Sequence, residues 1–304
     1  VFAVCAIIAL WRKDRPKYFG LGTTQKVGVK DYVDTLAHNR AIQMLVVSAS
    51  TDKLFMSTMS NSTVMICLFG IIFGNYAAFS SYSQITSIPI ALISILLMNK
   101  IARQMGQKAS MMAGTYGGII GSIIITLFLV FVNPRGDASK FAIPAFRIIR
   151  PDTWGTLFTG WSAVGLIFIL LVIAWRGVQA LSSSIVITMT ADCADYEVYR
   201  TGKYVPGLMG TLFSFVDKLV SSLAATLVAL FYSMAGFKDA LPDTLTPYSD
   251  GIFWATIGCF VLLPIVGWIC NVVAMHFYPL TKEKMEEIQA EIGRIKAEAA
   301  AKQA

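Results

Sequence analysis

Six long apolar runs, separated by short hydrophilic connectors, restrict what this chain can fold into. A helix needs about 20 mostly apolar residues to cross the hydrocarbon core of a bilayer. The chain is also 56% hydrophobic and only 14% charged, which is too apolar for an ordinary soluble domain. We therefore predict an all-α polytopic membrane protein, with spans at about residues 41–75, 77–98, 109–132, 154–191, 207–235 and 251–277.

Two of these runs indicate how their helices pack or bend. The fourth run is too long for one perpendicular span, so it either tilts and extends beyond the bilayer or breaks near Arg176–Gly177. The third run holds four glycines in two pairs with the GxxxG spacing, which lets helices approach closely. These pairs are Gly114/Gly118 and Gly117/Gly121.

The two ends of the chain differ from its centre. Residues 1–11 are apolar but too few to span a bilayer, so we expect them to be the end of a truncated transmembrane helix, and the chain to be a fragment. Residues 12–40 form a basic connector. Residues 278–304 are expected to form an amphipathic tail helix, with Thr281 as its N-cap. The apolar stripe of this helix is made by Met285, Ile288, Ile292 and Ile295.

The basic residues predict the orientation of the spans, because cytoplasmic connectors carry an excess of Lys and Arg. If the 12–40 connector is cytoplasmic, so are the turn 100–108, the segment 200–203 and the tail, and this side holds most of the 25 Lys and Arg residues. The basic residues do not form one soluble face, which argues against a nucleic-acid partner. Six spans split three and three are then opposite in sense, the inverted-repeat arrangement of half a major facilitator fold.

The fifth run carries two charged residues, Asp217 and Lys218, side by side. Lys218 lies roughly 16 Å along the helix from Gly207, which places it near mid-membrane. Charged groups there are costly and are by default a functional hypothesis. We take Lys218, Asp217 and Ser214 as candidates for a cavity that couples cation and substrate. The alternative is a structural ion pair with charges on neighbouring helices.

Two other spans also contain charged or polar candidates for this cavity. Arg176 and Gln179 share a helix face in the fourth run. The Arg176 guanidinium either binds sugar hydroxyls or a carboxylate bidentately, or snorkels to the outer headgroups. Asp52 and Lys53 in the first run either line the cavity or form a pair buried for packing.

The sequence contains no motif for catalysis or for metal binding. It has no nucleophile–base pair, no phosphate-binding loop and no metal-ligand spacing. Its five cysteines are scattered singly beside or within apolar runs, where we interpret them as small apolar residues. We therefore expect neither an enzyme nor a resident cofactor or metal.

The segment ADCADYEVYRTGKYVPG, residues 191–207, carries the most specific signal. We expect it to lie in a short water-facing hinge between two spans. It resembles the AD-x-x-DY segment after the tenth helix of the glycoside–pentoside–hexuronide cation symporters, the family of melibiose permease, and Lys218 follows it as a lysine does in that family. NKIARQMGQK and YPLTKEKMEEIQAEI resemble the turn between helices eight and nine and the tail of the same family.

The resemblance covers the chain as the end of helix six, the cytoplasmic middle loop (12–40) and helices seven to twelve (41–277). It implies sodium- or proton-driven sugar symport by alternating access in a bacterial inner membrane, with a cytoplasmic carboxy terminus and Lys218 close to the cation site. The cation-binding carboxylates of the family sit in its amino-terminal half, a partner that this chain lacks. The resemblance also implies a cytoplasmic gate made by Asp192, Asp195, Tyr196 and Arg200.

The resemblance leaves the substrate open. Ser183 and Phe213 stand where the melibiose branch has a tryptophan and a glutamine, so its sugar contacts do not transfer. Arg176 suggests an anionic sugar such as a hexuronide. Two other functions stay open: a carrier of an amphiphile or lysolipid, which predicts a continuous apolar cavity wall, and a non-transporting membrane scaffold.

Overall fold

The computed structural model of the chain describes residues 28–132, 162–202 and 206–301, together with Arg135, Asp137 and Lys140. The expected truncated helix at 1–11 and most of the 12–40 connector lie outside these residues. The described elements are helices α2 (Val29–His38), α3 (Arg40–Met59), α4 (Ser62–Met65), α5 (Tyr76–Met105), α6 (Gln107–Val132), α7 (Ala163–Thr201), α8 (Pro206–Ser221), α9 (Ala224–Met234), α10 (Asp250–Ile257), α11 (Leu263–Phe277) and α12 (Lys282–Ala301), with two π-helical segments, η2 (Ile66–Ile72) and η4 (Gly258–Leu262).

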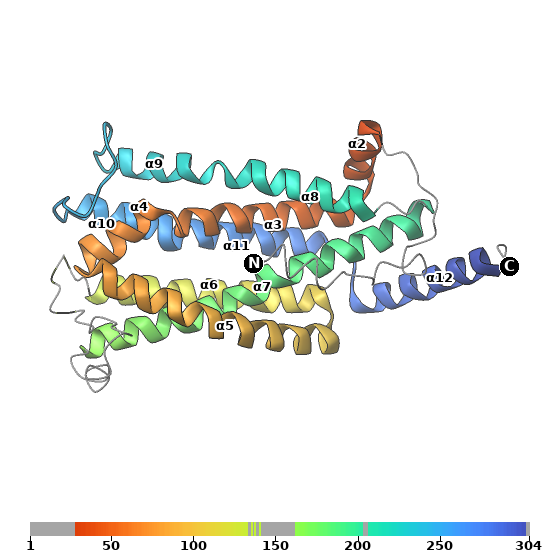
Figure 1. Cartoon of the computed structure of the whole chain (residues 1–304), viewed down its shortest axis with the longest axis horizontal. Coiled ribbons are helices and arrows are strands. Elements are labelled where there is room, and N and C mark those ends of the chain that lie inside the picture. Colours follow the sequence, from red (N-terminus) through yellow and green to blue (C-terminus); the bar gives the residue numbers. More distant parts are fainter. Residues whose placement is uncertain are drawn as a thin grey trace, which may run out of the picture.

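The long helices lie side by side along the long axis of the molecule (Figure 1). By length and composition five of them can cross a membrane, or six when α3 and the α4–η2 segment are taken as one bent span. These six correspond in order to the six predicted runs, and the all-α polytopic fold is confirmed. Helix α3 packs against α11 and α8, while α7 packs against α6 and α5.

Helix α7 is one unbroken helix of 39 residues. It is therefore roughly 58 Å long, nearly twice the thickness of the hydrocarbon core. Of the two alternatives for the fourth run, a break near Arg176–Gly177 is wrong, and the helix is long enough to extend beyond a bilayer. Most of the predicted hinge is wrong too, because the acidic stretch from Asp192 continues the helix. The helix ends where Gly202 adopts the left-handed conformation at φ 70° and its N–H bonds the Val198 carbonyl.

The first span bends by 48° between α3 and the α4–η2 segment. The sequence is polar there, and Asn61 takes an extended backbone and accepts a hydrogen bond from the Thr63 N–H, which starts a new helix. Asn39 and Asn75 cap α3 and α5 in the same way. Short polar side chains thus set where these helices begin.

The glycines of α6 allow the close approach that their spacing predicts. A Cβ added at Gly118 would lie 3.0 Å from the Trp268 ring of α11, and one at Gly121 would lie 2.5 Å from the Trp175 ring of α7. The Trp175 indole also donates a hydrogen bond to the Gly118 carbonyl, at 3.1 Å. Helix α6 is therefore held between two buried tryptophans.

One end of the bundle collects the segments that the sequence predicts to be basic and cytoplasmic. Figure 1 places α2, the α5–α6 turn, the end of α7 and α12 together there, and we call this the basic end. Helix α12 packs on α7, with Ile288 and Ile292 buried, and the Thr281 hydroxyl accepts a hydrogen bond from the Lys284 N–H. The tail thus contains a helix that begins just after Thr281 and buries two residues of its predicted stripe, while the side chain of Ile295 lies outside the described part of the chain.

Candidate functional site

A pocket with a mixed polar and apolar wall opens between three spans, and we call it the Arg176 pocket. It has a volume of about 290 Å³. Its wall combines one charged residue, three other polar residues and five apolar ones. They are Met56, Met59 and Ser60 of α3, Ser87, Ile90 and Ala91 of α5, and Arg176, Gln179 and Ala180 of α7.

Arg176 and Gln179 reach the same pocket because residues three apart share one face of a helix. The Arg176 Nη1 donates a 2.7 Å hydrogen bond to the Ser83 hydroxyl of α5. Next to it, the Ser94 hydroxyl donates to the Gly177 carbonyl at 2.8 Å, which ties α5 to α7. Gln179 is 3% exposed, and neither polar atom of its amide has a hydrogen-bond partner among the described residues. The structure thus brings the two α7 candidates together.

The structure places Asp52 elsewhere, in contacts between α3 and α11. Its side chain is 7% exposed and accepts a 3.0 Å hydrogen bond from the Trp268 indole. Nearby, the Ser48 hydroxyl donates to the Asn271 amide oxygen at 2.8 Å. Lys53, beside Asp52 in the chain, is exposed. Asp52 therefore lies in an interhelical polar contact, one helical turn from Met56 in the pocket wall.

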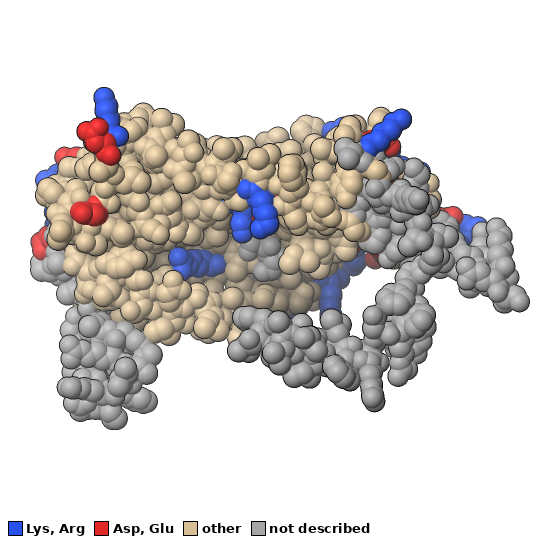
Figure 2. All heavy atoms as spheres, turned by 45° about the horizontal axis from the view of Figure 1, so that its top comes forward, with Lys and Arg blue, Asp and Glu red and all other residues tan. Residues whose placement is uncertain are grey.

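The candidates on α8 lie on a more open face. Lys218 and Ser214 are exposed, and Asp217 is half-buried. Within the described part of the chain, neither charged side chain forms an ion pair or hydrogen bond. In Figure 2, Lys and Arg atoms also appear within the uncharged belt between the two charged ends. An unpaired charge in such a belt is costly unless water, a ligand or another polypeptide contacts it.

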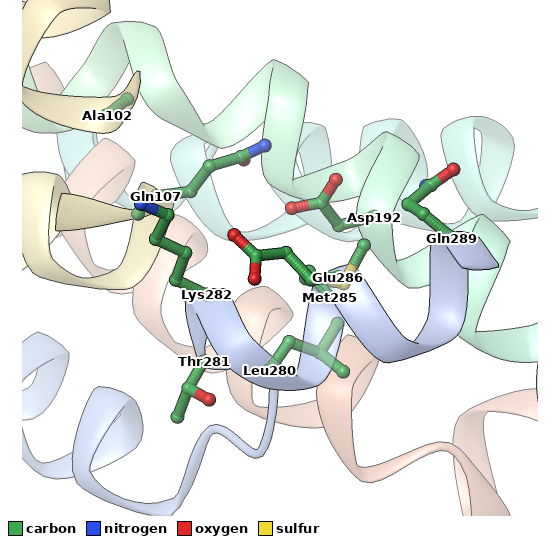
Figure 3. Close-up of a pocket in the computed structure, with 10 residues that line it drawn as sticks. Ala102, Gln107, Asp192, Leu280, Thr281, Lys282, Met285, Glu286 and Gln289 are labelled. Atoms are coloured by element: carbon green, nitrogen blue, oxygen red, sulfur yellow. The ribbon is translucent and has the colours of Figure 1, made fainter. Parts of the chain in front are cut away.

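Asp192, a predicted gate residue, lines a second cavity at the basic end (Figure 3), with a volume of about 270 Å³. The side chains of Asp192 on α7, Gln107 on α6 and Glu286 on α12 reach into this space. On the same side of α7, Asp195 accepts a hydrogen bond from the Gln289 amide of α12. Two predicted gate residues thus contact or face the tail helix, and Tyr196, a third, is half-buried.

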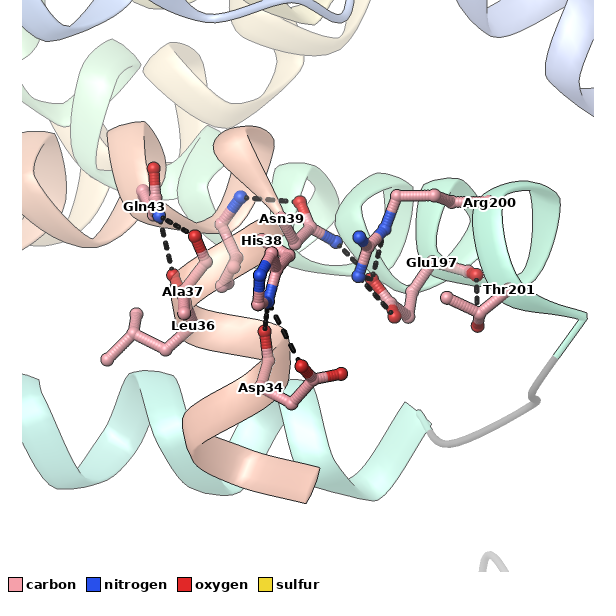
Figure 4. Close-up of polar contacts among 10 residues, drawn as sticks. Asp34, Leu36, Ala37, His38, Asn39, Gln43, Glu197, Arg200 and Thr201 are labelled. Atoms are coloured by element: carbon pink, nitrogen blue, oxygen red, sulfur yellow. Dashed lines mark hydrogen bonds and ion pairs between the residues drawn. The ribbon is translucent and has the colours of Figure 1, made fainter. Parts of the chain in front are cut away.

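The fourth predicted gate residue, Arg200, forms an ion pair with the buried carboxylate of Glu197 on the same helix (Figure 4). Arg200 Nη2 lies 2.9 Å from Glu197 Oε1. The Asn39 amide, at the start of α3, donates a 2.8 Å hydrogen bond to Glu197 Oε2. Glu197 is 4% exposed and Asn39 is fully buried. This cluster joins the connector before α3 to the end of α7.

Sequence reasoning missed Asn39 and did not place Glu197 in the gate. Asparagine directly before an apolar helical run is a recognisable N-cap signal, and this signal would have identified the helix start. Nothing in the sequence shows that the nitrogen of the Asn39 amide donates a hydrogen bond to Glu197, 158 positions away. In the described residues, moreover, no group of three or more His, Cys, Asp or Glu could hold a metal ion.

Replacing Asn39 with alanine is expected to lower the free energy of unfolding by about 2 kcal/mol, because it removes both the cap of α3 and a donor to a buried carboxylate. Asn39→Ser is the matched control, since it keeps a capping oxygen but loses the longer amide NH₂ that donates to Glu197, and should lose about half as much. Thermal unfolding in detergent measures both. An Asn39→Ala midpoint equal to that of the unsubstituted protein would contradict the role of this cluster.

Comparison with known proteins adds two findings. A family model described as MFS/sugar transport protein matches residues 1–282. A protein described as a glucuronide carrier protein homolog, from Escherichia coli (strain K12), is 28% identical over 163 residues. That match covers 52% of this chain but 33% of the relative, so it spans about a third of the relative's length.

Proposed function

Because this chain belongs to the MFS/sugar transport family, whose members are transporters and not enzymes, we propose that it is the carboxy-terminal part of a secondary active transporter. The carrier moves a glycoside, pentoside or hexuronide together with Na⁺ or H⁺ by alternating access. The cation binds mainly to helices that this chain does not contain, and Lys218 lies beside that site.

One observation carries the proposal: two basic side chains on the spans, Arg176 and Lys218, have no acidic partner in the described chain. Arg176 bonds only a serine hydroxyl, and Lys218 is exposed without an ion pair. A purely structural membrane bundle pairs or omits such charges, because an intramembrane charge is costly. A carrier, in contrast, uses them to face a water-filled cavity.

The proposed orientation places the basic end in the cytoplasm of a bacterial inner membrane. The Lys and Arg residues of α2, the α5–α6 turn and α12 support it, since positive connectors stay inside. The missing amino-terminal half then packs against the face of α8 that carries Lys218. The relative whose name mentions glucuronide supports an acidic sugar among the possible substrates.

Lys218→Ala, made in the full-length carrier that contains this chain, is expected to reduce gradient-driven sugar uptake into membrane vesicles at least about tenfold, the effect of losing one charge-assisted contact. Uptake is measured with neutral and acidic glycosides, with and without a sodium or a pH gradient. Lys238→Ala is the matched control, because it removes the same exposed charge from a connector.

Loss of uptake in Lys218→Ala alone would support cation coupling through this residue. If the unsubstituted carrier takes up no sugar under either gradient, sugar symport is wrong and uptake of a lysolipid becomes the next measurement.

A further inference from the structure

The Arg176 pocket has a net positive charge, because none of its nine lining residues is acidic. The Arg176 guanidinium has five N–H donors in a planar fork. Nη1 donates a hydrogen bond to the Ser83 hydroxyl, and this bond orients the guanidinium plane. The edge formed by Nε and Nη2 has no partner among the described residues. That edge matches the two oxygens of a carboxylate.

Gln179 provides a second, independent observation. Its side chain is almost fully buried, yet in the part of the chain that the structure describes both its oxygen and its nitrogen lack a hydrogen-bond partner. Burying unpaired polar groups is costly, and native structures rarely leave them so. Gln179 lines the same pocket, one helical turn from Arg176. A polar ligand between them would therefore form hydrogen bonds with both side chains. An amide offers a donor and an acceptor together, which is what a sugar hydroxyl needs.

The remaining wall fits one sugar ring. Ser60 and Ser87 add hydroxyl groups from α3 and α5, and five apolar side chains cover the rest of the wall. The volume of about 290 Å³ lies at the lower end of the range for ligand pockets.

We propose that the Arg176 pocket is the subsite that selects acidic over neutral sugars: Arg176 binds the sugar carboxylate, and Gln179 binds a hydroxyl of the same ring. The inference rests on the proposed sugar transport and goes further, because it assigns selectivity to two residues of α7. Ser83 acts as a positioning residue that holds the guanidinium.

Binding of methyl glucuronide and methyl glucoside to the purified full-length carrier tests the inference, because the two probes differ by the carboxylate. Arg176→Gln is expected to lower the preference for the acidic probe about 10- to 100-fold, the range for losing hydrogen bonds to a charged group. Affinity for the neutral probe should change little. Arg176→Lys should recover part of the preference, since it keeps the charge but not the fork.

Gln179→Leu separates binding from structure. If Gln179 serves a ligand, leucine removes two unpaired polar atoms from the interior and should raise the unfolding temperature while it weakens binding of both probes about tenfold. A residue that only supports the fold would show the opposite effect on stability. Unfolding temperature and binding are therefore measured on the same sample.

Two results would overturn the inference. An acidic-to-neutral preference that is unchanged in Arg176→Gln, in a carrier that binds both probes, would exclude Arg176 as the selective residue while sugar binding stands. Binding of neither probe to the unsubstituted carrier would overturn both this inference and the proposed sugar transport.

Discussion

Gly121→Val is expected to prevent α6 and α7 from packing as they do in the native bundle. The first carbon of any side chain at residue 121 would lie 2.5 Å from the Trp175 ring, well inside van der Waals contact. Trp175 cannot move away easily, because it is 2% exposed and its indole bonds the Gly118 carbonyl. Overpacking of this kind costs about 1–3 kcal/mol and sometimes more.

Gly210→Val on α8 is the matched control for this change, because nothing lies within 4 Å of a Cβ added at Gly210. Size-exclusion chromatography and thermal unfolding in detergent measure both variants. We expect Gly121→Val to aggregate or to unfold at a much lower temperature, and Gly210→Val to behave as the unsubstituted protein. A monodisperse Gly121→Val of normal stability would show that the two helices have room to separate.

Trp268→Ala is the second change with a large expected effect. Trp268 is 2% exposed; its ring packs on Gly118 and meets Trp175 edge to face at 6.1 Å. Its indole N–H is also the donor to the buried Asp52 carboxylate. Removing a buried tryptophan costs about 3–5 kcal/mol, and leaving Asp52 without its donor adds to that cost.

Two milder variants separate the contributions of volume and hydrogen bond. Trp268→Phe keeps much of the ring but loses the N–H, so we expect a loss of about 1–3 kcal/mol. Asp52→Asn keeps an acceptor oxygen for the indole and should change stability less than Trp268→Phe does. If Trp268→Phe unfolds at the same temperature as the unsubstituted protein, the bond to Asp52 contributes nothing and packing alone holds this contact.

Local patterns predicted much of the fold. The six apolar runs correspond to five helices that can cross a membrane, or six when the bent pair counts as one span, because a bilayer sets the length of each. The glycine spacing in α6 gave a close helix contact because it places small residues on one face. The tail stripe gave an amphipathic helix with Ile288 and Ile292 buried. Each of these features depends on residues that are neighbours in the chain.

The features that the sequence did not reveal depend on contacts between distant residues. The acidic stretch after Met189 is polar enough to suggest a hinge, but α12 and the connector before α3 cover its side chains and the helix continues. Asp52 carries a charge typical of a cavity, yet its partner is Trp268, 216 residues away. A single sequence does not show which of several possible partners a buried polar group has.

In the candidate site, sequence spacing correctly put Arg176 and Gln179 on one face. It could not show that Ser83 orients the guanidinium or that no described residue bonds the Gln179 amide. Those facts come from the way α5 crosses α7. The assignments of Lys218 and of the gate residues to transport stay predictions.

The continuity of α7 has a mechanical consequence. Arg176 in the pocket and Glu197 at the basic end lie on one rigid rod, roughly 32 Å apart along its axis. A tilt of about 10° at the pocket would shift the far end by about 5 Å, one helical turn. Asn39 and Gln289 form hydrogen bonds with side chains near that end, so in the proposed carrier a tilt of α7 at the pocket would strain or break these contacts.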